Sequence, residues 1–360
     1  MSSFSRKRRQ GLESGDMKAK RQVLDFLESP DWLFQEIHGQ SMQYLFAHVS
    51  SSTYRDSSFL DHRMSPLPTE VRGAAFQLVN RLLNSDSRPA NYVFHSAFCC
   101  STLFCNCLQA VSDSLVMKEP SVLGHLADAL AHSQNSGNFR RQNWQKILDP
   151  ALRLLEKTYP GQRGVIIKPA NSANNMMEDI LELRPSKTLF MYGSLNDFLL
   201  SNLKGLDESR HMVPLFLKRL LPLSDYAEKL QLADVQSLEH LQQCAVLWHA
   251  QLYHFSRLAE NNDSVRCLAA SDFLQQPNAV VQRALAHFDL PCDAGRLSEL
   301  AESGPLSRHS KSGDRFDAGA RADQNAALSA QYGEELQDTL HWMGGLLNRL
   351  PIELPLQAQL

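Results

Sequence analysis

Two adjacent hydroxyl side chains, Ser101 and Thr102, stand where a strand-like run of the sequence gives way to a helix-like run. Residues 92–95 have the composition of a strand, and residues 103–111 have the apolar spacing of a helix. A helix that starts directly after a buried strand begins with N–H groups that lack intrahelical acceptors, and such groups favour an anion. The loop at residues 96–102 therefore predicts a site for an anion such as a phosphate group.

The pattern of nucleotide kinases, G-x-x-x-x-G-K-[ST], describes this loop poorly. When the pattern is laid over residues 95–102, only Thr102 agrees with it. His95 and Cys100 take the two glycine positions, and Ser101 takes the position of the lysine. An anion would therefore be held by backbone amides and hydroxyl groups, without a lysine from the loop itself.

The elements around this loop follow from short apolar runs of the kind that form buried parallel strands. Four such runs occur, at residues 91–95, 164–168, 188–192 and 265–269. Segments with helical spacing separate them, at residues 101–117, 121–132, 141–157, 174–183, 196–206 and about 223–260. This alternation predicts an α/β protein with a doubly wound parallel sheet, covered by helices on both faces, with its ligand at the carboxyl ends of the strands.

The chain divides into four parts by composition and pattern. We expect a basic flexible tail at residues 1–21 and a helical N-terminal segment at residues 22–88. The α/β domain then occupies residues 89–324, and a C-terminal helix in residues 325–360 packs on it.

Composition narrows the class of protein. The 360 residues are 43% hydrophobic and 21% charged, which is ordinary for a globular protein with a sizeable core. A net charge of −3 argues against nucleic acid as the main partner. The sequence has no apolar run long enough for an integral membrane segment and no secretory leader at its start, so we expect a cytoplasmic protein.

Seven cysteines are present, and four of them lie at positions 99, 100, 105 and 107. This spacing is a weak match to a zinc site, and we expect no metal. The cysteines are expected to be small buried residues around the loop and its helix, in a reducing compartment. The alternative is a reactive thiol at Cys99 or Cys100, because a helix start lowers the pKa of a thiol.

Four segments, in their order along the chain, resemble the sulfotransferase family that uses 3′-phosphoadenosine 5′-phosphosulfate (PAPS). They are residues 98–103, 189–201, 267–291 and 308–313, and the resemblance covers residues 90–315. It implies a sheet of the P-loop type. It also implies transfer of a sulfuryl group from PAPS to a hydroxyl or amine acceptor, which would be a small molecule, a carbohydrate or a lipid. Whether the chain forms a homo-oligomer is left open.

The resemblance assigns the first loop to the 5′-phosphosulfate of PAPS. The residues that it places there are Ser96, Phe98, Cys99, Cys100, Ser101 and Thr102. Ser101 and Thr102 match the two hydroxyl positions of the family, whereas Phe98 stands where a basic residue is usual and Cys100 where glycine is usual. Lys168, at the end of the next predicted strand, could supply the cation that the loop lacks.

Two further segments are implied to hold the 3′-phosphate. Ser201 matches the family's serine, while Gly193 occupies the position of its arginine. Arg308 and Lys311, followed by Gly313, resemble the late basic loop that covers this phosphate.

Sulfuryl transfer also needs a base for the acceptor proton and cations around the transferred group. Some family members use a glutamate at about the distance from the loop at which Glu119 occurs, so Glu119 is the candidate base and His125 the second choice. The loop amides and basic side chains can carry the charge in this chemistry, so no metal is required.

Two other functions stay open. A non-catalytic member of the fold would bind a nucleotide or a protein partner, and the residues at Phe98 and Gly193 favour this reading. A nucleotide phosphotransferase on a related phosphate-loop fold is the third reading, against which the missing loop lysine argues.

Overall fold

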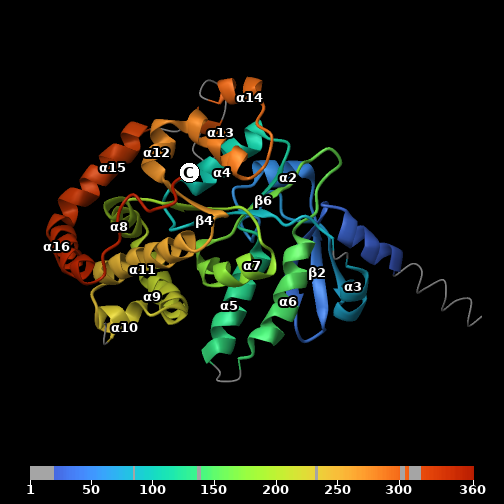
Figure 1. Cartoon of the computed structure of the whole chain (residues 1–360), viewed down its shortest axis with the longest axis horizontal. Helices are drawn as coiled ribbons and strands as arrows, with labels where there is room; N and C mark the ends of the chain where they lie inside the picture. The colour runs from blue at the N-terminus through green and yellow to red at the C-terminus, as the bar shows by residue number, and fades with distance from the viewer. Residues whose placement is uncertain (1–19, 84–85, 136–138, 232–233, 301–304, 308–317) are drawn as a thin grey trace, which may run out of the picture.

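The computed structural model describes residues 20–83, 86–135, 139–231, 234–300, 305–307 and 318–360 (Figure 1). In these residues a five-stranded sheet forms the centre of the molecule, and a three-stranded sheet lies to one side of it. No described helix combines the length and the apolar character needed to span a lipid bilayer.

The larger sheet is parallel throughout and has the strand order β5-β6-β4-β7-β8. Its strands are β4 (Asn91–His95), β5 (Leu115–Lys118), β6 (Val165–Lys168), β7 (Thr188–Tyr192) and β8 (Val265–Ala269). All residues of β4 to β7 are buried, as expected for parallel strands that are covered on both faces. The predicted fold class is confirmed, and each of the four predicted strands is present.

The order of the strands explains why a ligand site belongs at the end of β4. The chain runs from the central strand β4 to β5 and β6 on one side, and then crosses to β7 and β8 on the other. The connections that leave β4 and its neighbour therefore diverge, which opens a crevice at the carboxyl ends of these strands.

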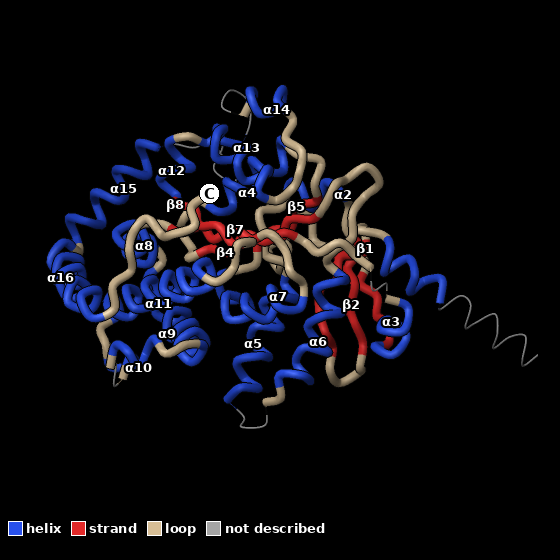
Figure 2. Tube along the Cα trace, viewed as in Figure 1, coloured by secondary structure: helices blue, strands red, loops and turns tan. Residues whose placement is uncertain are grey.

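Helices cover both faces of the sheet (Figure 2). Val93 of β4 faces a core shared with α4, α12 and α13, whereas Tyr92 and Phe94 face a core shared with α5, α7 and α11. The α-helices of this part are α4 (Ser101–Val111), α5 (Ser121–Asn135), α6 (Arg141–Leu154), α7 (Met177–Leu183), α8 (Leu195–Lys204), α9 (Leu206–Leu220), α10 (Tyr226–Leu230), α11 (His240–Glu260), α12 (Ala270–Gln275), α13 (Pro277–His287) and α14 (Ala294–Glu299). The short 3₁₀ turns are η1 (Asn171–Met176), η2 (Leu221–Leu223), η3 (Val235–Ser237) and η4 (Pro305–Ser307).

The segment predicted as one helix over residues 101–117 is instead a helix followed by a strand. Helix α4 ends at Val111, and both the N–H and the hydroxyl of Ser112 donate to the carbonyl of Leu108. The apolar residues that follow, beginning at Leu115, form β5 at the edge of the sheet. A four-residue buried strand has no periodicity of its own, which is why the sequence pattern merged it with the helix before it.

The N-terminal segment is not mainly helical, and that prediction was wrong for most of its length. It contains the antiparallel strands β1 (Trp32–His38), β2 (Gln43–His48) and β3 (Val71–Ala75) with α2 (Ser51–Asp56) and α3 (Phe76–Leu82), after helical residues 20–28. Phe34 of β1 lies directly opposite Phe46 of β2, with ring centroids 5.7 Å apart. Cross-strand aromatic pairs of this kind stabilise a sheet more than the weak helical spacing favours a helix.

The C-terminal residues form two helices, α15 (Ala318–Gln331) and α16 (Gly333–Arg349), where one was predicted over residues 325–349. Helix α16 packs on α11 and buries Leu336, Met343 and Leu346. The last residues then run beside the edge strand β8, where the N–H of Cys267 donates to the carbonyl of Ala358 at 2.9 Å.

Candidate functional site

A cavity of about 410 Å³ opens at the carboxyl ends of the central strands. Eight of the site residues predicted from the sequence line it together: Phe98, Cys99, Cys100, Ser101, Thr102, Glu119, Lys168 and Ser201. These residues come from the loop after β4, the ends of β5 and β6, and helix α8. The structure therefore assembles into one site residues that lie up to about a hundred positions apart in the sequence.

The loop after β4 has a backbone conformation that is uncommon for residues other than glycine. Ala97, Phe98 and Cys100 have φ angles of 70°, 53° and 62°, in the left-handed region. Each such residue costs about 1 kcal/mol, so the surrounding packing must hold the loop in this shape. Loops that contain left-handed residues can turn successive N–H groups toward one concave side, which is a known form of anion site.

The start of α4 places further N–H donors directly after this loop. The first hydrogen bond of the helix runs from the N–H of Phe104 to the carbonyl of Cys100, at 3.0 Å. The N–H groups of Ser101 and Thr102 therefore precede the intrahelical ladder, where the partial positive charge of the helix favours an anion. Both side chains are buried, with 5% exposure, and both line the cavity.

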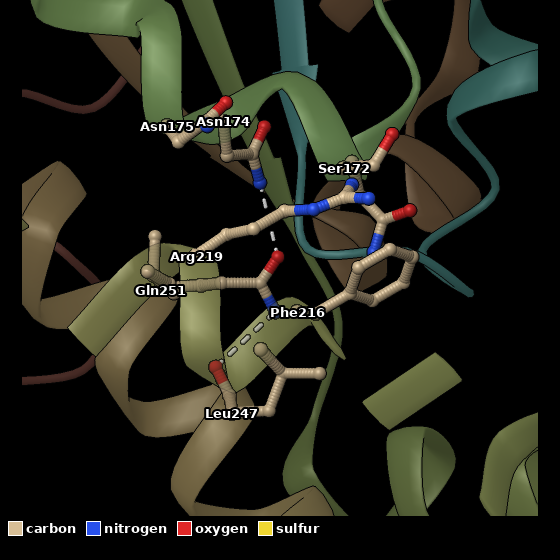
Figure 3. Close-up of a pocket in the computed structure, with 9 residues that line it drawn as sticks. Ser172, Asn174, Asn175, Phe216, Arg219, Leu247 and Gln251 are labelled. Atoms are coloured by element: carbon tan, nitrogen blue, oxygen red, sulfur yellow. Dashed lines mark hydrogen bonds between the residues drawn. The ribbon is translucent and has the colours of Figure 1, made fainter. Parts of the chain in front are cut away.

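The side-chain amide groups of Asn174 and Gln251 hold the end of β4 and the loop that follows it. The side-chain nitrogen of Asn174 donates to Oε1 of Gln251 at 3.0 Å (Figure 3). It also donates to the carbonyl of His95 at 3.1 Å. Gln251 donates in turn to the carbonyl of Ser96 at 3.4 Å. These bonds join the loop to η1 and to α11, and they account for part of the packing that maintains its strained backbone.

The ring of His95 fixes the first turn of the loop. Its Nδ1 accepts the N–H of Ala97 at 3.1 Å, so the proton of the neutral ring is on Nε2, which lies 3.1 Å from the carbonyl of Pro169. Ser96 is likewise part of the scaffold, because its hydroxyl accepts the N–H of Gly193 at 3.4 Å. Ser96 is 1% exposed and does not line the cavity, so its predicted role as a ligand residue is not supported.

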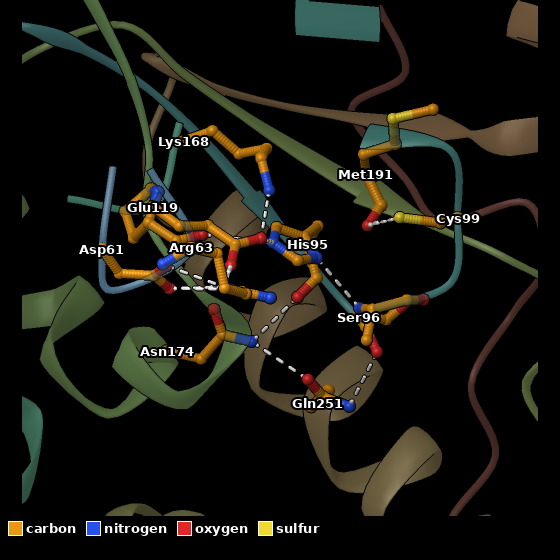
Figure 4. Close-up of polar contacts among 12 residues, drawn as sticks. Asp61, Arg63, His95, Ser96, Cys99, Glu119, Lys168, Asn174, Met191 and Gln251 are labelled. Carbon is orange, nitrogen blue, oxygen red and sulfur yellow. Dashed lines mark hydrogen bonds and ion pairs between the residues drawn. The ribbon is translucent and has the colours of Figure 1, made fainter. Parts of the chain in front are cut away.

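Glu119 and Lys168 meet at the ends of the neighbouring strands β5 and β6 (Figure 4). The ammonium group of Lys168 forms an ion pair with Oε1 of Glu119, and Lys168 has no exposed surface. The N–H of Glu119 donates to the carbonyl of Lys168 at 2.7 Å, with Glu119 at a φ of 54°. This backbone turn directs the carboxylate across the sheet edge toward the cavity.

Arg63 completes the charged cluster and was not predicted. Its guanidinium binds Oε2 of Glu119 at 3.0 Å, pairs with Asp61, and lies over the ring of Phe59 at 3.6 Å. Arg63 reaches the cavity from the loop between α2 and β3. The nearest sequence signal was the Asp-x-Arg spacing of Asp61 and Arg63, which does not reveal a partner 56 residues away.

The opposite wall of the cavity is largely apolar. Phe98 is 41% exposed, and its ring contacts that of Phe198 edge-on with centroids 5.7 Å apart. Met212, Val213, Phe216 and Leu247 extend this wall. The cavity thus has one end lined by the loop, the start of α4 and the pair of Glu119 and Lys168, and another end that is apolar.

Of the remaining predicted residues, one lies elsewhere in the described structure and two lie outside the described residues. His125 is exposed on α5 and lines a different cavity, of about 380 Å³, beside Trp144 and Arg140, so it does not face the loop. Arg308 and Lys311 lie outside the described residues.

The thiol of Cys99 does not have the environment of a reactive cysteine. It is buried and donates to the carbonyl of Met191 at 3.4 Å, and burial raises its pKa to about 12. Burial also raises the pKa of Cys105 to about 11 and that of Cys107 to about 12. These three thiols therefore stay protonated at neutral pH, as the structural interpretation of the cysteines expects.

A cavity of about 10 Å³, the size of one water molecule, adjoins the larger one and shares Asn171, Ser172, Phe216 and Leu247 with it (Figure 3). Asn174 and Asn175 line this small space, and among the described residues their side-chain oxygens have no hydrogen-bond partner. The small cavity is thus polar at its base, and both polar and apolar side chains line it where it meets the larger one.

Comparisons with known proteins give similarity at the level of structure. No family model and no curated protein matches the chain. Among solved structures, a sulfotransferase domain from the curacin biosynthetic pathway is 12% identical, with a TM-score of 0.38, over 69% of this chain and 99% of that domain.

Two further solved structures are similar to the chain to the same degree. A sulfotransferase from Alicyclobacillus acidocaldarius is 15% identical, with a TM-score of 0.35, over 69% of this chain and 94% of its own. A sulfotransferase domain from the Synechococcus PCC 7002 olefin synthase is 12% identical, with a TM-score of 0.37, over 77% of this chain and 93% of that domain. Scores of this size describe a partial likeness of fold, so the activity has to be inferred from the cavity.

Proposed function

We propose that this protein transfers a sulfuryl group from PAPS to a hydroxyl or amine acceptor bound in the 410 Å³ cavity. One observation carries the proposal. The left-handed loop before α4, with Ser101 and Thr102, opens into the same cavity as the ion pair of Glu119 and Lys168. An anion cradle, a cation and a carboxylate are the groups that sulfuryl transfer requires.

The residues present fit the phosphosulfate end of PAPS, which supplies an activated sulfuryl group on a phosphate leaving group. The amides of the loop, with the hydroxyls of Ser101 and Thr102, would hold the phosphosulfate oxygens. Lys168 would neutralise charge on the phosphate, in place of the basic residue that Phe98 replaces. Ser201 would hold the 3′-phosphate from the other side of the cavity, together with Arg308 and Lys311.

Glu119 would act as the proton acceptor. When the acceptor oxygen or nitrogen bonds to sulfur, its proton passes to the carboxylate, and the electron pair of the broken S–O bond stays on the departing phosphate. The apolar wall around Phe98 and Phe198 favours an acceptor with an apolar or aromatic body.

The test is a thermal-shift titration with adenosine 3′,5′-bisphosphate, the product that PAPS leaves behind, against ATP with magnesium. Micromolar bisphosphate should raise the melting temperature, because a ligand that binds only the native state stabilises it. A shift with ATP alone would favour a phosphotransferase. No shift with either nucleotide would refute donor binding.

A non-catalytic binding protein is the second candidate, and Phe98 is the observation that favours it. An aromatic ring stands where charge would develop during transfer, and it cannot stabilise that charge as a cation does. A protein of this kind would bind the bisphosphate but would form no sulfated product when PAPS and a panel of hydroxyl and amine acceptors are supplied.

A further inference from the structure

We propose that Glu119 is an internal counter-ion, which holds Lys168 and Arg63 in the free protein and yields these cations to the incoming anion. This inference rests on the proposed function and deepens it. It gives Glu119 a role in selecting the ligand by charge, before any role as a base.

Lys168 has unused hydrogen-bonding capacity. An ammonium group has three N–H donors, yet among the described residues the carboxylate of Glu119 is its one hydrogen-bond partner. Lys118, its neighbour across the strands, shows the contrast, because its ammonium binds the carbonyl of Arg55 and the side chains of Asn106 and Gln109. A fully buried lysine that lines a cavity with donors to spare is arranged for a further acceptor.

Arg63 can exchange partners without losing its place. Its guanidinium is bound on one side to Asp61 and on the other to Glu119. The loop that carries it is tied to the sheet by the N–H of Leu60, which donates to the carbonyl of Lys118 at 2.7 Å. If the bond to Glu119 is given up, Asp61 still holds the guanidinium at the cavity.

The charges of the cluster balance while no ligand is bound. Lys168 and Arg63 carry two positive charges, and Glu119 and Asp61 carry two negative ones. An anion that binds Lys168 must therefore compete with the carboxylate of Glu119, and a doubly charged oxyanion competes better than a singly charged one. The exchange also releases the carboxylate when the donor arrives, so that it becomes available for the acceptor proton at that stage.

The experiment measures the binding of inorganic sulfate and of adenosine 3′,5′-bisphosphate to Glu119→Gln by calorimetry. Removing a negative charge within about 4 Å of a bound anion should tighten sulfate binding about tenfold or more. A residue that is only a base would leave binding unchanged. The double variant Glu119→Gln, Lys168→Met should lose the gain, because the released cation is then absent.

Glu208→Gln is the matched control. Glu208 is an exposed carboxylate that lines the same cavity without forming an ion pair in the described structure, so its removal should change sulfate affinity less than threefold. An equal gain of sulfate affinity in both variants would show that any negative charge in the cavity weakens sulfate binding to the same degree. This result would overturn the proposal.

Unchanged or weaker sulfate binding by a folded Glu119→Gln would also overturn the proposal. Should that variant fail to fold, Glu119→Asp withdraws the carboxylate by one methylene and should tighten sulfate binding in the same direction. The proposed function fails separately, when wild type and variant bind sulfate but neither binds the bisphosphate.

Discussion

The buried side chain of Lys157 predicts how the free energy of unfolding depends on pH. Its ammonium is buried and donates to the carbonyls of Phe26 and Trp32, so it ties the first helix and strand to the segment that follows α6. Burial lowers its pKa from 10.5 to about 7, against the opposing attraction of Asp25 and Asp31. The folded protein therefore resists protonation of a group that the unfolded chain protonates readily.

The sign of the pH effect follows from the proton counts. Between pH 7 and 10.5 the unfolded chain binds more protons than the folded one, so the free energy of unfolding rises with pH over this window. Burial of this lysine lowers the free energy of unfolding by about 4 kcal/mol at pH 7 and by about 2 kcal/mol at pH 9. The free energy of unfolding therefore rises by about 2 kcal/mol between these two pH values. Below pH 7 both states are protonated and the contribution becomes constant.

Urea unfolding of the wild type and of Lys157→Met at pH 6, 7, 8 and 9 checks this. Between pH 7 and 9, the free energy of unfolding of the variant should rise by about 2 kcal/mol less than that of the wild type. It should also be less stable than the wild type at pH 9, because two carbonyls lose a buried donor at about 1–3 kcal/mol each. Lys146→Met, which changes an exposed lysine of α6, is the control. A variant with the full wild-type slope would show that Lys157 is not the titrating group.

Three further predictions concern the cavity and the core. Thr102→Ala should weaken bisphosphate binding about three- to tenfold, because a hydroxyl donor in the cradle is lost; unchanged affinity in calorimetry would remove Thr102 from the site. Gly193→Arg should fold with a melting temperature close to that of the wild type, since a Cβ there would meet Cys99 at an ordinary 3.6 Å, and it should bind the bisphosphate more tightly. A large loss of melting temperature would contradict this reading of the position. Arg184→Met should lower the free energy of unfolding by about 3–5 kcal/mol, because it leaves the carboxylate of Glu156 buried without its partner; a loss under 1 kcal/mol would mean that water replaces the pair.

Four of the five strands of the central sheet could be predicted because they are continuous apolar runs, whereas the short buried strand β5 was merged with the helix before it. Continuous apolar runs such as residues 188–192 have no other simple explanation in a chain of this composition. The small sheet could not be predicted in the same way, because its stability comes from pairs between strands, such as Phe34 with Phe46. Such pairs are contacts between distant positions, and local spacing does not reveal them.

The residues of the candidate site also differ in whether local sequence patterns could reveal them. Thr102, Glu119 and Lys168 each follow the end of a strand in the sequence, and parallel strands bring such ends to one edge. Arg63 and the amide chain through Asn174 approach that edge from elements whose positions depend on tertiary packing. His125 was wrongly predicted to lie in the site, because the turn after β5 directs α5 away from the loop and His125 lines a different cavity.

The position of Arg63 in the chain decides which fragment would keep the whole charged cluster of the cavity. This residue belongs to the connection between α2 and β3, so the N-terminal segment supplies a charge to the cavity as well as packing beside the main domain. Excision of residues 20–88 would leave the cavity without one of its cations and without Phe59, which lines it beneath the guanidinium of Arg63. An attempt to reduce the protein to its parallel sheet and flanking helices would therefore remove part of the charged cluster together with the supporting structure.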